Sequence, residues 1–340
     1  MHVHGNLMGM TKSALARDGR RLSYEEHGRP DGSPVFLMHG MPGSRKGPRP
    51  RSSVLYLLGV RLIAYDRPGY GGSDRRLGRT IADAAADVQD LADALGIERF
   101  AVAGRSGGAP HALACAALLP ERVTRAAALV PLAPMDRMGS AEWYRGMNER
   151  NVLWYRAAER GLAAYTERVA GPMAEVRADP DKHLPYEDPE LPKSDRAVVA
   201  DYGIKVMLSE NFSEGLRKSP HGWIDDTIAL VSPWGFDPAR ISAPVLLWHG
   251  THDIFCPMSH SKWLHRRIAT SQLHLVEGVS HFSAVEVLPR MVLPWLVATE
   301  DTENAAPPVG QAPQVGQAPQ VGLVPRDGGK PESPEAESAA

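Results

Sequence analysis

Residues 100–119 read FAVAGRSGGAPHALACAALL, and this stretch decides the fold class. The first four residues form an unbroken apolar run, which is typical of a strand buried on both faces of a sheet. Pro110 begins a run rich in alanine and leucine, which predicts a helix that ends at Pro120. Between strand and helix stands GRSGG, residues 104–108, in the context that gives a G-x-S-x-G motif its meaning.

The turn at GRSGG predicts a nucleophile. A sharp strand-to-helix turn would expose Ser106 at the start of the helix, and side chains at Gly104 or Gly108 would clash there. The N–H of Gly107 is then one expected oxyanion donor. Because a serine hydroxyl is a weak nucleophile unless a base takes its proton, the motif also calls for a histidine and an acid.

The rest of the chain repeats the strand-then-helix pattern. Residues 21–27 follow an Asp18-Gly19 turn and predict a hairpin strand. Further mainly apolar runs occupy residues 35–38, 61–65, 127–130, 245–248 and 273–276, with an amphipathic helical run at 81–95. This alternation predicts an α/β fold with a mostly parallel, doubly wound sheet covered by helices on both faces.

The alternation breaks at residues 135–232, which contain helical segments rich in arginine, glutamate and aromatic residues. We interpret this stretch as a helical lid inserted into a core made of 21–134 and 233–300. Residues 1–20 are expected to form an N-terminal extension. Residues 301–340 contain the hexapeptide VGQAPQ twice and are dominated by Pro, Gly and Gln, which predicts a disordered tail.

Two residues complete the predicted catalytic set. Asp253 follows the strand at 245–248, and His281 follows the strand at 273–276. The carboxyl ends of parallel strands meet at one sheet edge, and the chain order Ser, acid, His suits this kind of core. We therefore expect His281 to act as the base and Asp253 to orient it. Asp136, after an earlier strand, is the alternative acid.

The second oxyanion donor should come from the loop after the strand at 35–38. That loop reads HGMPG, residues 39–43. We assign the backbone N–H of Met41, since Pro42 has no N–H to donate. With Gly107 this gives two fixed donors for a developing negative charge.

Taken together, the chain resembles the α/β-hydrolase superfamily, in the lid-bearing group of esterases, C–C bond hydrolases, proline iminopeptidases and cofactor-free haloperoxidases. The matching motifs are HGMPGS (39–44), DRPGYGGSD (66–74), GRSGG (104–108), HGTHD (249–253) and GVSHF (278–282). The resemblance implies an α/β-hydrolase fold with an inserted helical lid. Superfamily epoxide hydrolases and haloalkane dehalogenases carry Asp as nucleophile, so Ser106 speaks against both. Proline iminopeptidases resemble HGGPG and GGSWG at two motifs, which this chain matches in part.

Three side chains are candidate substrate contacts. Arg105 flanks the nucleophile, where it either meets an anionic substrate group or forms a structural salt bridge. The aromatic residues Trp143 and Trp154 either line an apolar pocket above Ser106 or anchor the lid to the core. No HExxH or CxxC pattern occurs, so no metal site is expected.

The composition argues against a nucleic-acid-binding, disulfide-rich or membrane-spanning protein. The net charge is −2 over 340 residues, which offers no basic footprint for nucleic acid or an anionic membrane. Two cysteines give no disulfide framework, and no apolar run reaches the length of a membrane span. We expect a cytoplasmic protein, by default.

The sequence thus predicts a serine hydrolase that cleaves a carboxylic ester or related small acyl substrate through an acyl-enzyme and needs no cofactor. Three alternatives remain open: acyl transfer or perhydrolysis from the same acyl-enzyme, a proline iminopeptidase-like peptidase, and a non-catalytic binding protein.

Overall fold

The computed structural model describes residues 11–179, 181, 190–298 and 321–323. These residues contain a nine-stranded sheet in the order β1-β2-β4-β3-β5-β6-β7-β8-β9. The strands are β1 Lys12–Leu15, β2 Arg21–Gly28, β3 Ser33–Met38, β4 Val60–Tyr65, β5 Phe100–Arg105, β6 Val123–Leu129, β7 Val245–Gly250, β8 Ser271–Val276 and β9 Val321–Leu323. The six strands from β4 to β8 in this order run parallel, and β1, β2 and β9 pair antiparallel at the two edges.

The predicted fold class is confirmed, since each apolar run of the sequence forms a strand of the central sheet. Burial explains the pattern. In β5, the residues from Phe100 to Gly104 are all buried, so neither face offers a position for a polar side chain. The predicted helices at 81–95 and 110–119 are found as α2 Asp83–Ala94 and α3 Ala109–Leu118.

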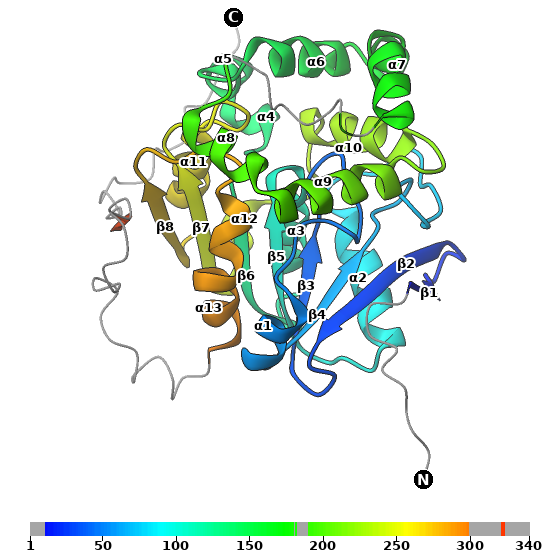
Figure 1. Cartoon of the computed structure of the whole chain (residues 1–340), viewed down its shortest axis with the longest axis vertical. Helices are drawn as coiled ribbons and strands as arrows, with labels where there is room; N and C mark the ends of the chain where they lie inside the picture. Colours follow the sequence, from blue (N-terminus) through cyan, green and yellow to red (C-terminus); the bar gives the residue numbers. More distant parts are fainter. Residues whose placement is uncertain (1–10, 180, 182–189, 299–320, 324–340) are drawn as a thin grey trace, which may run out of the picture.

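Helices cover both faces of the sheet (Figure 1). One core cluster joins the sheet to α2, α3 and α11 (Ser259–Arg267) through residues such as Val88, Leu113 and Leu264. The cluster on the other face involves α1 (Ser52–Leu57), α12 (Ala284–Val287) and α13 (Leu293–Val297). No helix in the described parts of the chain combines the length and apolar character that crossing a membrane requires.

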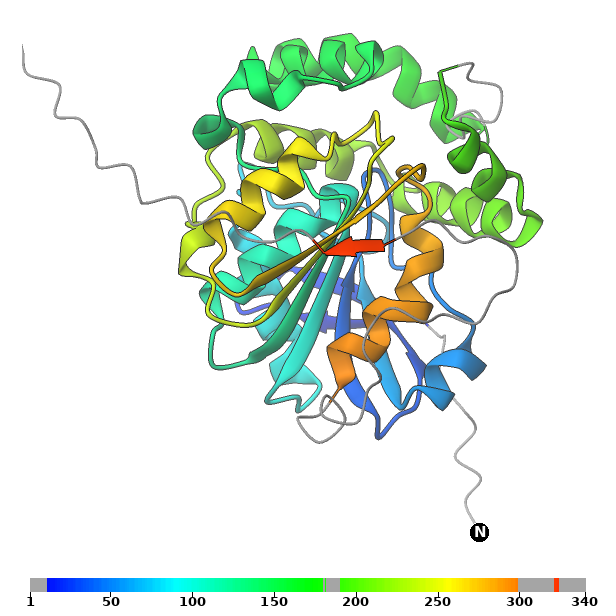
Figure 2. The ribbon, with the colours of Figure 1, turned by 90° about the vertical axis from the view of Figure 1, so that its left-hand side faces the viewer.

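The remaining helices lie between β6 and β7, where the sequence predicts an insertion. They are α4 Met135–Met138, α5 Ser140–Tyr144, α6 Glu149–Glu159, α7 Leu162–Ala178, α8 Lys193–Ala200, α9 Tyr202–Gly215 and α10 His221–Val231. Figures 1 and 2 show them as a layer across the carboxyl ends of the parallel strands.

A buried ion-pair network fastens α10 to the core. Asp226 of α10 pairs with Arg67 and Arg79 at 2.6 Å each, and Tyr70 donates to it at 2.9 Å. Burial alone would raise the pKa of Asp226, but the two guanidinium groups hold it well below its usual range. The motif at 66–74 therefore supplies the attachment point of the insertion.

At each end of the chain the structure adds a short edge strand to the sequence prediction. The expected N-terminal extension 1–20 contributes β1, which pairs with β2 from Lys12 opposite Tyr24 to Leu15 opposite Arg21. The predicted disordered tail lies outside the described residues except at β9, which pairs with β8. An open sheet edge offers unpaired N–H and C=O groups, so a short segment can join it without burying a large apolar surface.

Candidate active site

Ser106 stands at the turn between β5 and α3, with a φ of +55°. Such a value is uncommon for a residue with a side chain and marks a constrained backbone. The flanking glycines allow the turn. A Cβ on Gly104 would lie 2.3 Å from the Gly108 oxygen, and one on Gly108 would lie 2.3 Å from the His39 oxygen. The crowding expected from the GRSGG motif is therefore present.

The loops after β7 and β8 bring an acid and a histidine together. His281 Nδ1 lies 2.8 Å from Asp253 Oδ2, and both side chains are buried. This contact fixes the imidazole so that Nε2 is the nitrogen left for proton transfer. The alternative acid, Asp136, is exposed on α4.

The Asp253 carboxylate is well supported. The N–H groups of Phe255 and Cys256 donate to its Oδ1 at 2.8 and 2.9 Å. Burial alone would raise the pKa of Asp253, but His281 and His249 hold it below its usual range. The group is therefore a carboxylate at neutral pH, as an orienting acid must be.

The two expected oxyanion donors belong to neighbouring backbone segments. A Cβ placed on Gly107 would lie 2.8 Å from Met41 Cβ and 3.7 Å from Met41 N. Arg67 fixes the loop that contains Met41 through two hydrogen bonds. Its Nη2 donates to Gly40 O at 3.2 Å, and its backbone N–H donates to His39 Nε2 at 3.2 Å. These contacts keep the Met41 segment next to the turn that carries Ser106.

Ser106 and His281 line one cavity of about 110 Å³. No hydrogen bond joins their side chains in the described structure, and the neighbour of Ser106 Oγ is Cys256 Sγ at 4.0 Å. Catalytic hydrogen bonds are often long without substrate and tighten when it binds. Burial raises the pKa of the Cys256 thiol well above its usual value, so this sulfur is not an activated nucleophile.

Aromatic side chains dominate the cavity wall. They come from the insertion and from the loops after β7 and β8: Trp154, Tyr155, Tyr165, Phe212, Trp223, Phe255 and Phe282. The lining includes Arg105 and Arg150 as charged side chains and, among the described residues, no Asp or Glu. A cavity of this kind suits an apolar or aromatic group.

Two of the three candidate substrate contacts line the cavity, and the third does not. Trp154 and Arg105 line the cavity. Trp143 lies elsewhere, fully buried, with its Nε1 donating to Ala133 O at 2.8 Å and its ring edge-on to Tyr155. Trp143 therefore anchors the insertion to the core, because its ring is enclosed and its polar atom is used there.

Sequence reasoning missed two residues of the insertion that hold the loops of the site. Asp195 of α8 is fully buried and accepts from the N–H groups of His281 at 3.2 Å and Phe282 at 2.7 Å. Asn211 of α9 accepts from Ser44 N at 2.7 Å through Oδ1, and its backbone oxygen accepts from Ser44 Oγ at 3.0 Å. One helix thus holds the histidine loop and the next holds the oxyanion loop.

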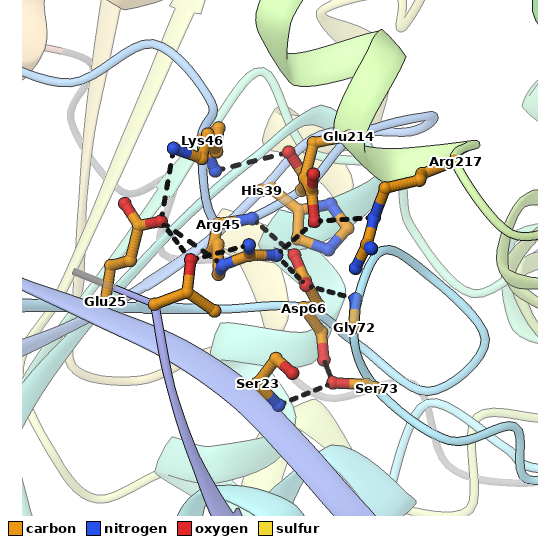
Figure 3. Close-up of polar contacts among 12 residues, drawn as sticks. Ser23, Glu25, His39, Arg45, Lys46, Asp66, Gly72, Ser73, Glu214 and Arg217 are labelled. Carbon is orange, nitrogen blue, oxygen red and sulfur yellow. Dashed lines mark hydrogen bonds and ion pairs between the residues drawn. The ribbon is translucent and has the colours of Figure 1, made fainter. Parts of the chain in front are cut away.

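A charged cluster extends this contact (Figure 3). Arg45, two residues after the oxyanion loop, donates to Glu214 of α9 at 2.7 Å and lies 3.3 Å from Glu25 of β2. Its N–H donates to Asp66 Oδ1 at 2.7 Å. Burial alone would raise the pKa of Glu25, but the His27 hydrogen bond, with Lys46, Thr11 and Arg45, lowers it to about 2. The cluster therefore joins four segments: β2, the segment after the oxyanion loop, the segment after β4, and α9.

Comparisons with known proteins agree with this fold. The sequence model of the alpha/beta hydrolase fold matches residues 33–172. A non-heme chloroperoxidase from Streptomyces lividans is 34% identical over 288 residues, which cover 83% of this chain and 96% of that protein. A proline iminopeptidase from Neisseria meningitidis is 26% identical over 281 residues, 76% of this chain and 86% of that protein.

A solved structure shares the fold. The alpha/beta hydrolase fold protein from Chitinophaga pinensis superposes with a TM-score of 0.61 at 18% identity, covering 85% of this chain and 98% of that one. At such low identity the match speaks to the fold alone.

Proposed function

Because this chain belongs to the alpha/beta hydrolase fold family, we propose that it is a serine hydrolase that cleaves a carboxylic ester or related small acyl substrate. Ser106 is the nucleophile, His281 the general base, and Asp253 the acid that orients the base. The backbone N–H groups of Met41 and Gly107 receive the developing oxyanion. We further propose that the helices of residues 135–232 act as a lid over this site.

One observation carries the proposal. A serine on a constrained turn with φ +55° shares a cavity with a histidine that lies 2.8 Å from a buried carboxylate. These three residues come from three different loops, and each loop follows a parallel strand at the same sheet edge. A binding protein on this fold would have no use for all three groups together, so the arrangement supports catalysis.

The reaction follows from these positions. His281 Nε2 takes the hydroxyl proton as Ser106 Oγ bonds to the substrate carbonyl carbon, and the carbonyl oxygen gains negative charge between the N–H groups of Met41 and Gly107. Collapse breaks the bond to the leaving alcohol, which takes the proton from His281. Water then gives a proton to His281 and attacks the acyl-enzyme. The acid departs, and Ser106 regains its proton.

A second candidate shares the acyl-enzyme. The chloroperoxidase relative and the apolar cavity favour transfer of the acyl group to a small acceptor such as hydrogen peroxide, in place of water. Peroxide would enter the same second step and leave as a peracid. An aminopeptidase is disfavoured, because the ammonium of a peptide N-terminus needs a carboxylate and the described cavity lining contains arginines and no Asp or Glu.

Pre-steady-state hydrolysis of 4-nitrophenyl hexanoate tests the proposal. We expect a burst of nitrophenol and a hexanoyl adduct on the peptide that contains Ser106. His281→Ala should lose the burst while the protein keeps its fold, and Cys256→Ala should still form the adduct. An adduct on Cys256, or hydrolysis that survives Ser106→Ala, would contradict the proposal. Adding hydrogen peroxide or methanol and analysing the products separates hydrolysis from acyl transfer.

A further inference from the structure

Arg105, which is partly buried, differs from the fully buried arginines of this protein. Arg67 and Arg79 both pair with Asp226 at 2.6 Å, and Arg45 donates to Glu214 at 2.7 Å. The mostly buried Arg105 side chain makes no hydrogen bond or ion pair within the described residues, and burial is the sole cause that lowers its pKa, to about 10. The group is still a cation at neutral pH, so it is a charge without a counterion.

The guanidinium lies beside the reacting groups. A Cβ placed on Gly40 would lie 3.8 Å from Arg105 Nη2 and also 3.8 Å from Ser106 Cβ. The arginine and the nucleophile therefore flank the same glycine of the oxyanion loop. Arg105 lines the catalytic cavity and also a smaller cavity under that loop.

A mostly buried charge without a partner is costly, whereas a charge that meets an anion on binding serves recognition. The cavity supplies no such anion itself, since its described lining contains no Asp or Glu. A guanidinium presents paired N–H donors that match the two oxygens of a carboxylate. The aromatic wall above suits the apolar remainder of a substrate.

We propose that the cavity selects acyl substrates that carry a carboxylate at the far end of the acyl or leaving group, and that Arg105 binds this carboxylate. This inference rests on the proposed serine hydrolase function. It makes Arg105 a specificity-determining residue: a neutral ester of the same size leaves the guanidinium unpaired in the cavity, and a carboxylate ester pairs it.

Two matched pairs of esters test the preference. Mono(4-nitrophenyl) adipate and 4-nitrophenyl hexanoate differ by a carboxylate on the acyl side. For the leaving-group side, the pair is 4-acetoxybenzoate and 4-acetoxybenzamide. We expect kcat/KM to favour the charged member at least tenfold in one of the pairs. No preference in either pair would overturn the proposal.

Substitution at Arg105 assigns the preference to this residue. Arg105→Met should lower the charged-to-neutral ratio of kcat/KM by about 10–100-fold, as expected for a lost charge-assisted hydrogen bond. Arg105→Lys should keep part of it. Arg160→Met, at an exposed arginine directly after α6 and outside the cavity lining, is the matched control and should keep the wild-type ratio. Equal losses on both esters in Arg105→Met would show that Arg105 serves the oxyanion or the fold instead, which overturns the proposal.

A binding measurement separates this inference from the proposed function. Titration of 4-hydroxybenzoate and 4-hydroxybenzamide into the Ser106→Ala protein reports the anion site without catalysis. We expect the carboxylate to bind at least tenfold tighter than the amide, and Arg105→Met to remove that difference. If the difference is present but no ester is hydrolysed, the serine hydrolase proposal fails alone. If esters are hydrolysed and the difference is absent, the anion site fails alone.

Discussion

The loops at the carboxyl edge of the sheet and the helices above them contribute different things to the candidate site. The loops carry the proposed reacting side chains, Ser106, Asp253 and His281. The insertion contributes cavity walls and two side chains, Asp195 and Asn211, whose hydrogen bonds go to the loops. The core loops therefore carry the proposed reacting groups, and side chains of the insertion hold two of the site's loops by hydrogen bonds.

The two regions also differ in how they are held. The core is an apolar sheet covered by helices on both faces. The insertion is tied down by polar contacts as well, through Asp226 of α10, Asn211 of α9 and Asp195 of α8. Polar ties are geometrically specific, since each needs its partners at a set distance and angle. Polar contacts can therefore hold a loop in one position, whereas apolar contacts hold helices against a sheet without fixing a single residue.

The largest expected effect lies in the core. Asp253→Asn should lower kcat by about 10⁴-fold, because the amide no longer holds His281 in the tautomer that accepts the serine proton. Thermal unfolding should change much less than kcat, since the two N–H donors to this side chain retain an oxygen acceptor. Steady-state kinetics on an activated ester measures the loss. A fall of less than tenfold would remove Asp253 from the proposed site.

Asp195→Ala tests the insertion at the histidine loop. It leaves the N–H groups of His281 and Phe282 without their acceptor. We expect kcat to fall about 10–100-fold, because a displacement of about 1 Å in a reacting group has effects of this size. KM should change less. Asp195→Asn keeps an acceptor oxygen and should restore part of kcat. If Asn and Ala behave alike in kcat, or KM takes the whole effect, Asp195 does not position the base.

Asn211→Ala tests the insertion at the oxyanion loop and should have a smaller effect on kcat than Asp195→Ala. The Ser44 N–H would lose its buried acceptor, which lowers the free energy of unfolding by about 1–3 kcal/mol. Urea unfolding and ester hydrolysis measure the two effects. Glu210→Ala, at an exposed position of the same helix, is the control and should change neither. Equal results for both variants would show that α9 does not hold the loop.

The smallest effect concerns pH and the cluster at Arg45. The pKa of Glu25 is lowered from 4.5 to about 2 in the folded protein, so its ionised form contributes stability above pH 4.5 that is lost as pH falls toward 2. Glu25→Gln should therefore lower Tm at pH 7, and the difference from wild type should shrink at pH 3. Thermal unfolding at both values measures this. Exposed Glu286→Gln is the control, and a difference that stays constant with pH would contradict the prediction.

Much of the core could be predicted because its signals are local. An apolar run directly indicates a buried strand. GRSGG indicates the turn, because a Cβ on Gly104 or Gly108 would lie 2.3 Å from a carbonyl oxygen. The order of Ser106, Asp253 and His281 follows from the order of the strands. For the strands and the turn, a few adjacent residues contain the whole signal.

The contribution of the insertion could not be predicted, because its partners are distant in sequence. Asp195 and His281 are 86 residues apart, and KSDRAVVA has the appearance of an ordinary solvated helix start. Trp143 and Trp154 look alike in the sequence, yet the first is enclosed by the core and the second lines the cavity. The pairing of β1 and β9 depends on open sheet edges, which no local pattern reveals.

The most direct test of the central claim is labelling with a fluorophosphonate probe, wild type beside Ser106→Ala, with the modified peptide identified by mass spectrometry. The probe reacts with a serine that a neighbouring base has activated, so it reports the nucleophile and its base together. The account predicts one labelled site, at Ser106, and loss of labelling in Ser106→Ala while the protein stays folded. Labelling at another residue, or an unlabelled wild-type protein that is folded, would contradict it.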